Sequence, residues 1–497
     1  MLAEWSVAGK ADQMRPIVAL LLVVALVPTA CRPEPKGAVR ALIISGEPKI
    51  RDPSLGPLSL SDAVLLQNVA QGLVSFDASG NIVPGLAERW NVSDDGLTYI
   101  FRLASTQWPD GRKITAEQVA RLIKRQLAAR SRNTLKDTAG AIEDVVAMTD
   151  RVIEIQLVAP RPNLLALLAQ PELAILRGND GSGPFRAVWT GGPGGEVHLL
   201  REVVSSDEEQ TKHEEVLLAG ASASDAINDF LASKTDLVLG GTFADLPLTR
   251  RVRFSGGALR YDPAAGLFGL VPARSGGHLD NVDARRLLAE ALDRANFVSE
   301  LGVPGLAPRA TLLEPGLDGL LAPAAPAWFE APLADRLASL RARSERLFGK
   351  TKPVIKVVLP QGPGADLLLQ ELQLDWGAIG VTVQRAQNAT AADLLLVDEV
   401  APTTSPAWFV RRFRCAVAPV CDAQADQLME TARQMPVPDQ RYALLAQAAA
   451  RIDDMQLYIP IAAPIRWSLV SGRVQGFSGN RYARHTLSDL EQQPARD

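Results

Sequence analysis

The sequence contains few of the residues on which metal sites and many active sites depend, with four histidines and three cysteines among 497 residues. This scarcity leaves little room for a metal centre or for histidine-based catalysis. The 52 basic and 56 acidic residues give a net charge of −4, so no broad cationic face is available for nucleic acid. The sequence also lacks a phosphate-binding GxxxxGK[ST] loop and a GxSxG nucleophile elbow. Composition therefore favours a binding protein without cofactor or metal over an enzyme.

One long hydrophobic run is present near the start of the chain, IVALLLVVALV at residues 17–27, preceded by Arg15. Eleven residues are too few for a membrane-spanning helix, which needs about 20, but they match the apolar part of a secretory signal. Small residues then lead to Cys31, an order that resembles a bacterial lipoprotein signal. We expect residues 1–30 to be a signal peptide, Cys31 to be lipidated, and residues 31–37 to form a linker.

The residues around this run leave two alternatives open. Pro28 stands where lipoprotein signals usually have leucine, so an ordinary cleaved signal with an incidental Cys31 is the competing interpretation. Glu4 and Asp12 are unusual in the basic part of a signal, which favours Met14 over Met1 as the true start.

The other two cysteines bracket a short segment, AVAPV, between Cys415 and Cys421. Export to an oxidising compartment predicts a disulfide between them, closing a small loop. Two buried free thiols are the alternative.

Beyond the linker, the spacing of apolar residues predicts a mixed α/β chain of several domains. GGPGG at 191–195 predicts a hairpin loop, because Val197 stands where a dinucleotide fingerprint has its last glycine and no helix follows. Strands are predicted at 41–45, 97–103, 152–157, 354–360, 381–385, 393–397 and 458–463, and helices at 61–74, 115–127, 283–301, 365–377, 422–434 and 438–455.

Five segments in order resemble the extracytoplasmic solute-binding proteins of ABC importers, in the family of oligopeptide-, dipeptide- and nickel-binding proteins. The resemblance covers nearly everything after Cys31. These segments are GLVSFDASGNIVPGLAERWNVSDDGLTYIFRL (72–103), WPDGRKITAEQV (108–119), GSGPFRAV (181–188), DARRLLAEALDRANFV (283–298), and the closing pair RYALLAQAAARIDDMQLYIPI and VQGFSGN.

Most of the resembling residues are interpreted as scaffold rather than as ligand contacts. Trp108 is expected to fill a core while Asp110 and Gly111 turn a hairpin. Arg285 and Asp293 are expected to fix helix ends.

The resemblance implies a two-lobed α/β clamp of the periplasmic-binding-protein type (type II, large form) with an extra subdomain. Lobe one would comprise residues 38–60, 182–265 and 467–497, with 61–181 as the added subdomain, and lobe two would comprise 266–466. A hinge would close the lobes over a peptide or similar small solute. The protein would then act in the periplasm as a lipid-anchored monomer that delivers its ligand to a membrane permease and a separate ATPase.

The ligand-binding segment departs from the family pattern. Peptide-binding relatives use an aspartate to pair with the peptide ammonium group, and alignment on Pro406 places Pro402 at that position. Either the alignment shifts and Asp398 or Glu399 takes the role, or the peptide amino terminus is not held in the usual way. The candidate ligand-binding residues are Asp398, Glu399, Thr403, Thr404 and Trp408, with solvated charges and core packing of Trp408 as alternatives.

Two other functions compete with solute import. The departure at Pro402 allows a binding-only lipoprotein, a receptor or chaperone-like module without a transport partner. An exported hydrolase is disfavoured because no nucleophile, Cys–His or paired-carboxylate pattern stands out.

Overall fold

The computed structural model describes residues 37–190, 195–204, 211–321, 323–349 and 352–492. Residues Gly37–Asp497 cluster into one compact unit. The predicted signal peptide, Cys31 and most of the GGPGG loop lie outside the described residues. None of the helices described is long and apolar enough to cross a membrane.

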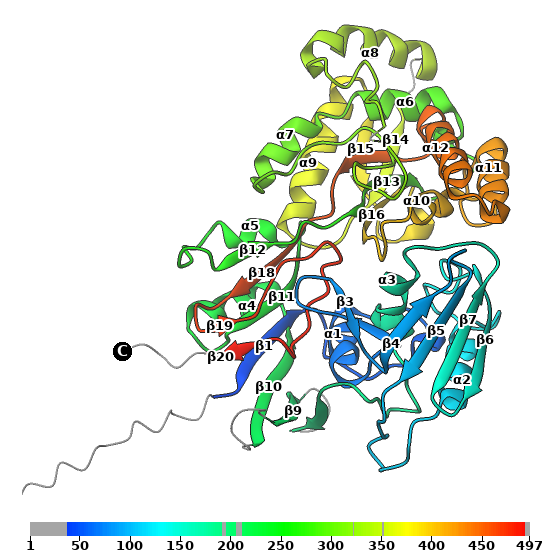
Figure 1. The fold of residues 1–497 in the computed structure, drawn as a ribbon. Helices are drawn as coiled ribbons and strands as arrows, with labels where there is room; N and C mark the ends of the chain where they lie inside the picture. The colour runs from blue at the N-terminus through cyan, green and yellow to red at the C-terminus, as the bar shows by residue number, and fades with distance from the viewer. Residues whose placement is uncertain (1–36, 191–194, 205–210, 322, 350–351, 493–497) are drawn as a thin grey trace, which may run out of the picture. The chain divides into compact units, whose positions relative to one another are not determined.

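A seven-stranded mixed sheet is assembled from segments far apart in the sequence (Figure 1). Its first strand, β1 (Val39–Ile44), pairs in parallel with β10 and β11, whereas the other pairings are antiparallel. Helices α1 (Leu60–Val69) and α4 (Ala223–Leu231) contact β1. The strand order is β12 (Leu259–Tyr261), β18 (Arg466–Val470), β11 (Leu237–Thr242), β1, β10 (Thr211–Ala221), β9 (Val197–Val204) and β8 (Arg186–Trp189).

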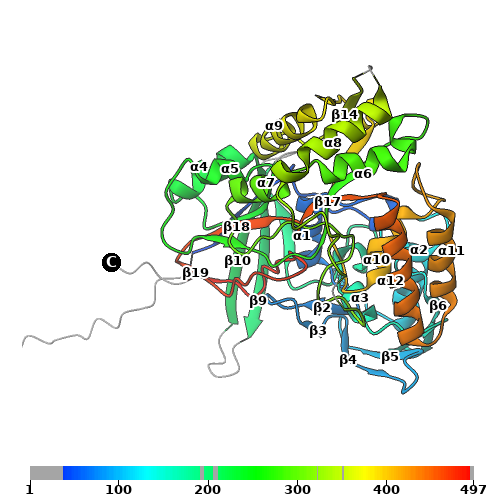
Figure 2. The same cartoon turned by 90° about the horizontal axis from the view of Figure 1, so that it is seen from above.

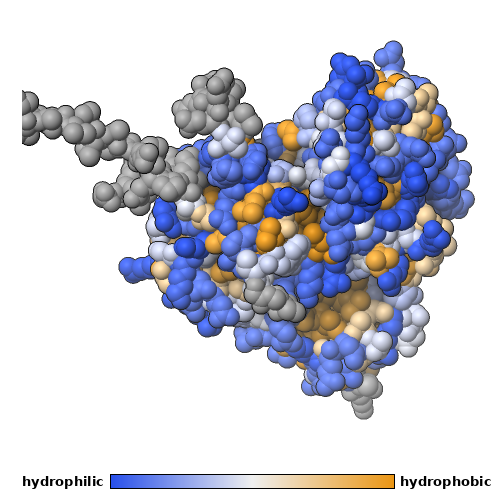
Figure 3. Space-filling view, turned by 90° about the horizontal axis from the view of Figure 1, so that it is seen from below, coloured by the Kyte–Doolittle hydropathy of each residue, from blue (hydrophilic) through white to orange (hydrophobic). Residues whose placement is uncertain are grey.

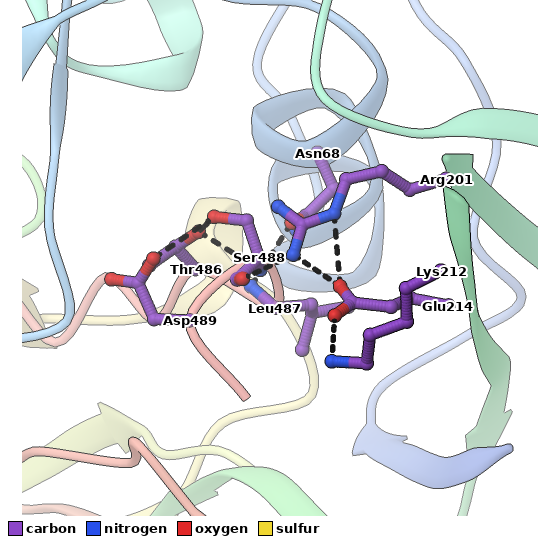
Figure 4. Close-up of polar contacts among 8 residues, drawn as sticks. All are labelled: Asn68, Arg201, Lys212, Glu214, Thr486, Leu487, Ser488 and Asp489. Carbon is purple, nitrogen blue, oxygen red and sulfur yellow. Dashed lines mark hydrogen bonds and ion pairs between the residues drawn. The ribbon is translucent and has the colours of Figure 1, made fainter. Parts of the chain in front are cut away.

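The end of the chain is fixed against this sheet by polar contacts (Figure 4). Arg201 on β9 donates to Glu214 on β10 at 3.0 Å and to the Ser488 carbonyl at 2.8 Å. The Leu487 amide donates to Asn68 on α1 at 3.0 Å. The short strands β19 (Val474–Gln475) and β20 (Glu491–Gln492) also pair here. Residues 487–492 are therefore held against the seven-stranded sheet and α1.

A separate antiparallel sheet of four strands is built from residues 87–157. Helix α2 (Ala116–Leu127) packs on it and begins with the predicted capping box, in which Thr115 and Gln118 bond reciprocally. The strand order is β4 (Ala87–Val92), β5 (Thr98–Leu103), β7 (Val152–Leu157) and β6 (Ile142–Thr149). Beside it lie η1 (Pro53–Leu55), the hairpin of β2 (Val74–Phe76) and β3 (Ile82–Pro84), α3 (Leu164–Leu168) and η2 (Pro171–Leu173).

The third large sheet has five strands and lies within residues 266–462. Its central strand β16 pairs in parallel with β14 and antiparallel with β13. The strand order is β15 (Thr382–Arg385), β14 (Val354–Val358), β16 (Leu394–Val400), β13 (Gly266–Pro272) and β17 (Ile459–Ala462). The helices of this region are α6 (Val282–Glu290), α7 (Arg294–Leu301), α8 (Leu333–Phe348), α9 (Pro363–Ala378), α10 (Pro406–Val410), α11 (Ala423–Gln434) and α12 (Pro438–Asp454), with short 3₁₀ turns η3 (His278–Asp280), η4 (Ala389–Ala391) and η5 (Arg411–Phe413); α5 (Leu246–Thr249) follows β11.

The chain passes twice between the seven-stranded and the five-stranded sheet. Residues 262–265 join β12 to β13, and residues 463–465 join β17 to β18. Both connections are short, and they lie next to each other because β12 pairs with β18 and β13 pairs with β17. Two short connections side by side are the geometry typical of a hinge between two domains.

Two of the helix predictions were wrong in extent. The helix expected over 61–74 ends at Val69, because the chain leaves it in extended conformation at Ala70 and Leu73 joins the core of the four-stranded sheet region. The helix expected over 283–301 is two helices, since Asp293 leaves the helical conformation and caps α7 by accepting from the Asn296 amide. Helix α8 was not predicted at all.

The predicted scaffold roles are visible in the structure. Trp108 is buried and donates to Gln118 at 3.0 Å, while Gly111 has the positive φ of 81° that the turn requires. The buried Arg285 guanidinium donates to the carbonyls of Leu279 and Met455, so it ties the start of α6 to the end of α12.

Candidate functional site

A cavity of about 580 Å³ lies where the three large sheet regions meet. The lining comes from the start of α1, the middle of β11, the end of β16, helix α10, the start of β18 and the segment 482–485. In Figures 1 and 2, α3 lies beside α10, which places the four-stranded region against the helices that follow β16. Seen from below, apolar residues gather in recesses of a mostly hydrophilic surface (Figure 3). A cavity of this size matches the pockets that enclose small ligands.

Charged side chains of both signs line this cavity. The acidic residues are Glu172, Asp262, Asp398 and Glu399, and the basic ones are Arg411, Arg412, Arg466 and Arg484. Four acids and four arginines balance one another, so the cavity suits a ligand that itself carries both charges or strong dipoles.

Asp398, a predicted ligand residue, is already engaged by the protein. Its Oδ1 lies 2.8 Å from Nη1 of Arg466, and both side chains are 16% exposed. Nη2 of Arg466 also donates to the Asp398 carbonyl at 3.0 Å. Burial raises the pKa of Asp398, and Arg466 opposes that shift. Arg466 therefore already compensates the negative charge of Asp398 that a ligand amine would pair with.

The remaining predicted ligand residues take different places. Glu399 lines the cavity but pairs with Arg412 at 2.7 Å. Thr403 is 2% exposed, and its hydroxyl accepts from the Ser405 amide at 3.2 Å. Thr404 is absent from the residues that line this cavity or its neighbour in the described chain, and its carbonyl accepts from the Asp318 amide.

Trp408 is packed into a core rather than left as an open stacking surface. It is 4% exposed, its ring meets Phe409 edge-on with centroids 5.0 Å apart, and Arg411 lies over it at 5.9 Å. It nevertheless lines the cavity described above and a second, smaller one.

Pro402, which takes the position of the family's aspartate, links two parts of the structure. Its carbonyl accepts a hydrogen bond of 2.9 Å from Gln170, which follows α3. The segment that was expected to supply an ammonium-binding carboxylate thus contributes a backbone contact to the four-stranded region instead.

Glu172 is a cavity residue that the sequence analysis missed. Its Oε1 accepts from Arg484 at 2.7 Å, and Oε2 is buried without a hydrogen-bond partner among the described residues. A single acidic residue inside the apolar stretch LLALLAQPELAIL (164–176) was the signal that could have revealed it.

Cys415 and Cys421 form a disulfide in the structure, with Cα atoms 5.2 Å apart. The closed loop precedes α11. The Cys415 amide donates to Asp426 on that helix at 3.0 Å.

The histidines contact carboxylates or aromatic rings singly. His485 pairs with Asp262 at 3.1 Å in the cavity wall, and His198 contacts Glu215 at 2.7 Å on the seven-stranded sheet. No group of three or more potential metal ligands occurs among the described residues.

Fold and cavity together define a solute-binding protein of the hinged two-lobe class. A family model, bacterial extracellular solute-binding proteins, family 5 Middle, matches residues 81–395, well over half of the chain. The chain belongs to this family. The family consists of binding proteins that act outside the cytoplasm, which confirms the predictions of solute binding, of an extracytoplasmic location and of a chain that is not an enzyme.

Curated relatives match the chain to different extents. It is 24% identical over 469 residues to "Probable di/tripeptide-binding protein 5" of Pseudomonas aeruginosa (strain UCBPP-PA14), covering 84% of this chain and 88% of that protein. It is 33% identical over 129 residues to "Probable deoxycholate-binding periplasmic protein YgiS" of Escherichia coli (strain K12). That match covers 22% of this chain and 24% of the relative's length.

The fold is shared with solved structures. The Escherichia coli murein tripeptide binding protein MppA superposes with a TM-score of 0.80 at 16% identity, covering 92% of this chain and 99% of that chain. At this identity the likeness shows the fold alone, and it confirms the predicted clamp.

Proposed function

We propose that the protein captures peptides in the cavity of about 580 Å³ and delivers them to the permease of an ABC importer, which a separate ATPase powers. The observation that carries the proposal is the balanced set of four carboxylates and four arginines in a cavity walled by all three sheet regions. A zwitterionic peptide presents an ammonium group, a carboxylate and backbone dipoles, all of which such a wall can pair. The names of the Pseudomonas relative and of MppA, a di/tripeptide-binding and a murein tripeptide binding protein, support the same ligand class.

The proposed lobes follow the predicted boundaries. Lobe one comprises residues 38–60, 182–265 and 467–497, with 61–181 as its subdomain, and lobe two comprises 266–466. The distribution of strands supports this division, although β18 begins one residue earlier, at Arg466. Ligand contacts to both lobes stabilise the closed arrangement, and only the difference in affinity between the two states drives closure. In this proposal the chain is a monomer anchored to the membrane through lipid on Cys31.

Glu172 is the carboxylate that this proposal assigns to the peptide ammonium group. All three carboxylates pair with an arginine, Glu172 with Arg484 through Oε1, but Oε2 of Glu172 is the buried oxygen that has no partner in the described part of the chain. A small rotation of this carboxylate brings a buried acceptor to a cation that enters the cavity, where low solvation strengthens the pair.

The test measures binding of di- to pentapeptides by calorimetry or thermal shift, with N-acetylated versions of the same peptides as chemical controls. We expect tighter binding of free-amine peptides by the wild type and loss of this preference in Glu172→Gln. The matched variant Glu399→Gln removes a carboxylate of the same cavity and is expected to keep the preference. If no peptide binds while a bile acid such as deoxycholate does, peptide capture is abandoned.

A binding-only lipoprotein remains the second candidate, and the replacement of the family's aspartate by Pro402 favours it. Uptake of a labelled peptide in cells that express the protein separates the two functions. Capture without uptake, in cells whose importer is otherwise active, supports the binding-only role.

A further inference from the structure

The smaller cavity, of about 140 Å³, shares Trp408 and Arg411 with the lining of the main one. One wall comes from residues 137–141 and 161–167 of the four-stranded region, and the other from residues 403–414 and 429–445 around α10 to α12. Because one water needs only about 10–15 Å³ of such volume, the cavity has room for a group of several heavy atoms.

Five arginines line this cavity, and three of them have no carboxylate partner. Arg433 pairs with Glu430 at 2.7 Å, and Arg414 approaches Asp137 at 3.6 Å. The other three, Arg161, Arg411 and Arg441, form no ion pair among the described residues.

None of the hydrogen bonds of these three arginines goes to a carboxylate, although Glu399 and Asp137 attract Arg411 from a longer distance. Arg161 donates to the carbonyls of Pro160 and Arg433, and Arg411 donates to the hydroxyl of Thr138. Arg441 is 4% exposed, and its Nη1 has no hydrogen-bond partner in the described residues. A buried guanidinium with an unsatisfied donor is costly unless an anion accompanies it.

The electrostatics of Arg161 reflect this crowding of like charges. Burial, followed by the neighbouring charges of Arg441 and Arg433, lowers the pKa of Arg161 to about 10. Arg161 still carries its charge at neutral pH, so Arg441 and Arg433 repel it across the cavity.

From the cavity, the three unpaired arginines and the orphan donor of Arg441, we infer a binding site for an oxyanion, a carboxylate or a phosphate. Guanidinium groups bind such anions through paired, charge-assisted hydrogen bonds. The anion joins the four-stranded region to α10–α12 and so stabilises the arrangement in which the two are in contact. Two sources share this chemistry: a free anion, or an acidic group of the ligand in the main cavity, since Trp408 and Arg411 line both cavities. The second source rests on the proposed function.

The first arm of the test titrates inorganic phosphate into the intact protein, with chloride at matched ionic strength, and follows the melting temperature. We expect phosphate to raise the wild-type Tm by about 2 °C or more beyond chloride. Arg441→Gln and Arg161→Gln should lose this phosphate-specific rise, and Arg441→Gln should melt higher than the wild type without anion because repulsion is relieved. Arg121→Gln, which removes an exposed charge on α2, is the control and should respond as the wild type does.

The second arm compares peptides that differ by a Glu-to-Gln change. If the acidic group of the ligand fills the cavity, the wild type binds the Glu peptide at least tenfold more tightly, and Arg161→Gln abolishes the difference while Gln-peptide affinity stays unchanged. Should Arg441→Gln fail to fold, Arg161→Gln decides both arms alone. The inference is overturned when neither phosphate nor the Glu peptide distinguishes the wild type from Arg161→Gln. Binding of the Gln peptide in that case leaves the proposed function standing.

Discussion

The Asp398 carboxylate on β16 and the Arg466 guanidinium at the start of β18 form an ion pair that joins the five-stranded sheet to the seven-stranded sheet beside the hinge. Their Oδ1 and Nη1 atoms are 2.8 Å apart, and each side chain is 16% exposed. The second hinge segment, residues 463–465, leads directly into Arg466. The ion pair therefore holds the end of this hinge segment against β16 of the five-stranded sheet.

Removal of one member of this pair should be far more costly than removal of both. Arg466→Gln leaves the buried Asp398 without a cationic partner, and we expect the free energy of unfolding to fall by about 3 kcal/mol. Asp398→Asn with Arg466→Gln should recover much of that loss. Urea unfolding followed by tryptophan fluorescence measures all three proteins.

The matched control is Arg412→Gln, which breaks the more exposed Glu399–Arg412 pair of the same cavity. We expect this substitution to change the free energy of unfolding by at most about 1 kcal/mol. If Arg412→Gln and Arg466→Gln lowered the free energy of unfolding equally, the Asp398–Arg466 pair would have no special role at the hinge.

Asp375 on α9 should make stability depend on pH. It is 5% exposed and accepts from the Asp293 amide at 2.6 Å, and burial raises its pKa to about 7. Between about pH 4 and pH 7 this carboxyl is therefore protonated in the folded protein and ionised in the unfolded chain. The free energy of unfolding consequently falls as the pH rises through this range. Asp375→Asn keeps the acceptor and should raise stability at pH 7 by on the order of 2 kcal/mol, with little gain at pH 4.

The control for this prediction is Asp366→Asn on the same helix, which removes a carboxylate that is 63% exposed. Chemical denaturation at several pH values between 4 and 8 compares the two variants. If Asp375→Asn raised the free energy of unfolding by the same amount at every pH, the Asp375 carboxyl of the wild type would not titrate in this range.

Loss of the Cys415–Cys421 disulfide should destabilise the protein modestly. The closed loop is short, and loop-closure entropy gives about 2 kcal/mol for its size. The variant Cys415→Ser/Cys421→Ser should unfold at lower denaturant concentration than the oxidised wild type. Added reductant should shift the wild type towards the variant and leave the variant unchanged; a wild type insensitive to reductant would argue against the bond.

Lipidation of Cys31 is a prediction from the sequence, since this residue lies outside the described residues. Labelled palmitate should enter the wild type and not Cys31→Ser, and the variant should leave the membrane fraction. A variant that stays membrane-bound would overturn the lipoprotein interpretation.

The sequence by itself determined the class of fold and most of the elements. The five segments between residues 72 and 480 that resemble the family, the capping box at Thr115 and the alternating strand at Val152 each carry a local signal. Such signals depend on residues close together in the chain, so they can be recognised in the sequence alone. The break between α6 and α7 was not predicted because apolar residues continue at helical spacing through residue 298. The pattern therefore shows no interruption at Asp293.

Only the tertiary structure decided which charged groups are free to meet a ligand. Asp398 was a candidate by its position in the chain, yet Arg466, 68 residues later, neutralises it. Glu172 and Arg441 belong to no sequence motif. In the folded protein they line cavities, and Oε2 of Glu172 and Nη1 of Arg441 have no hydrogen-bond partner among the described residues. Pairing between distant side chains depends on how the three sheets meet, and no local spacing in the sequence encodes that arrangement.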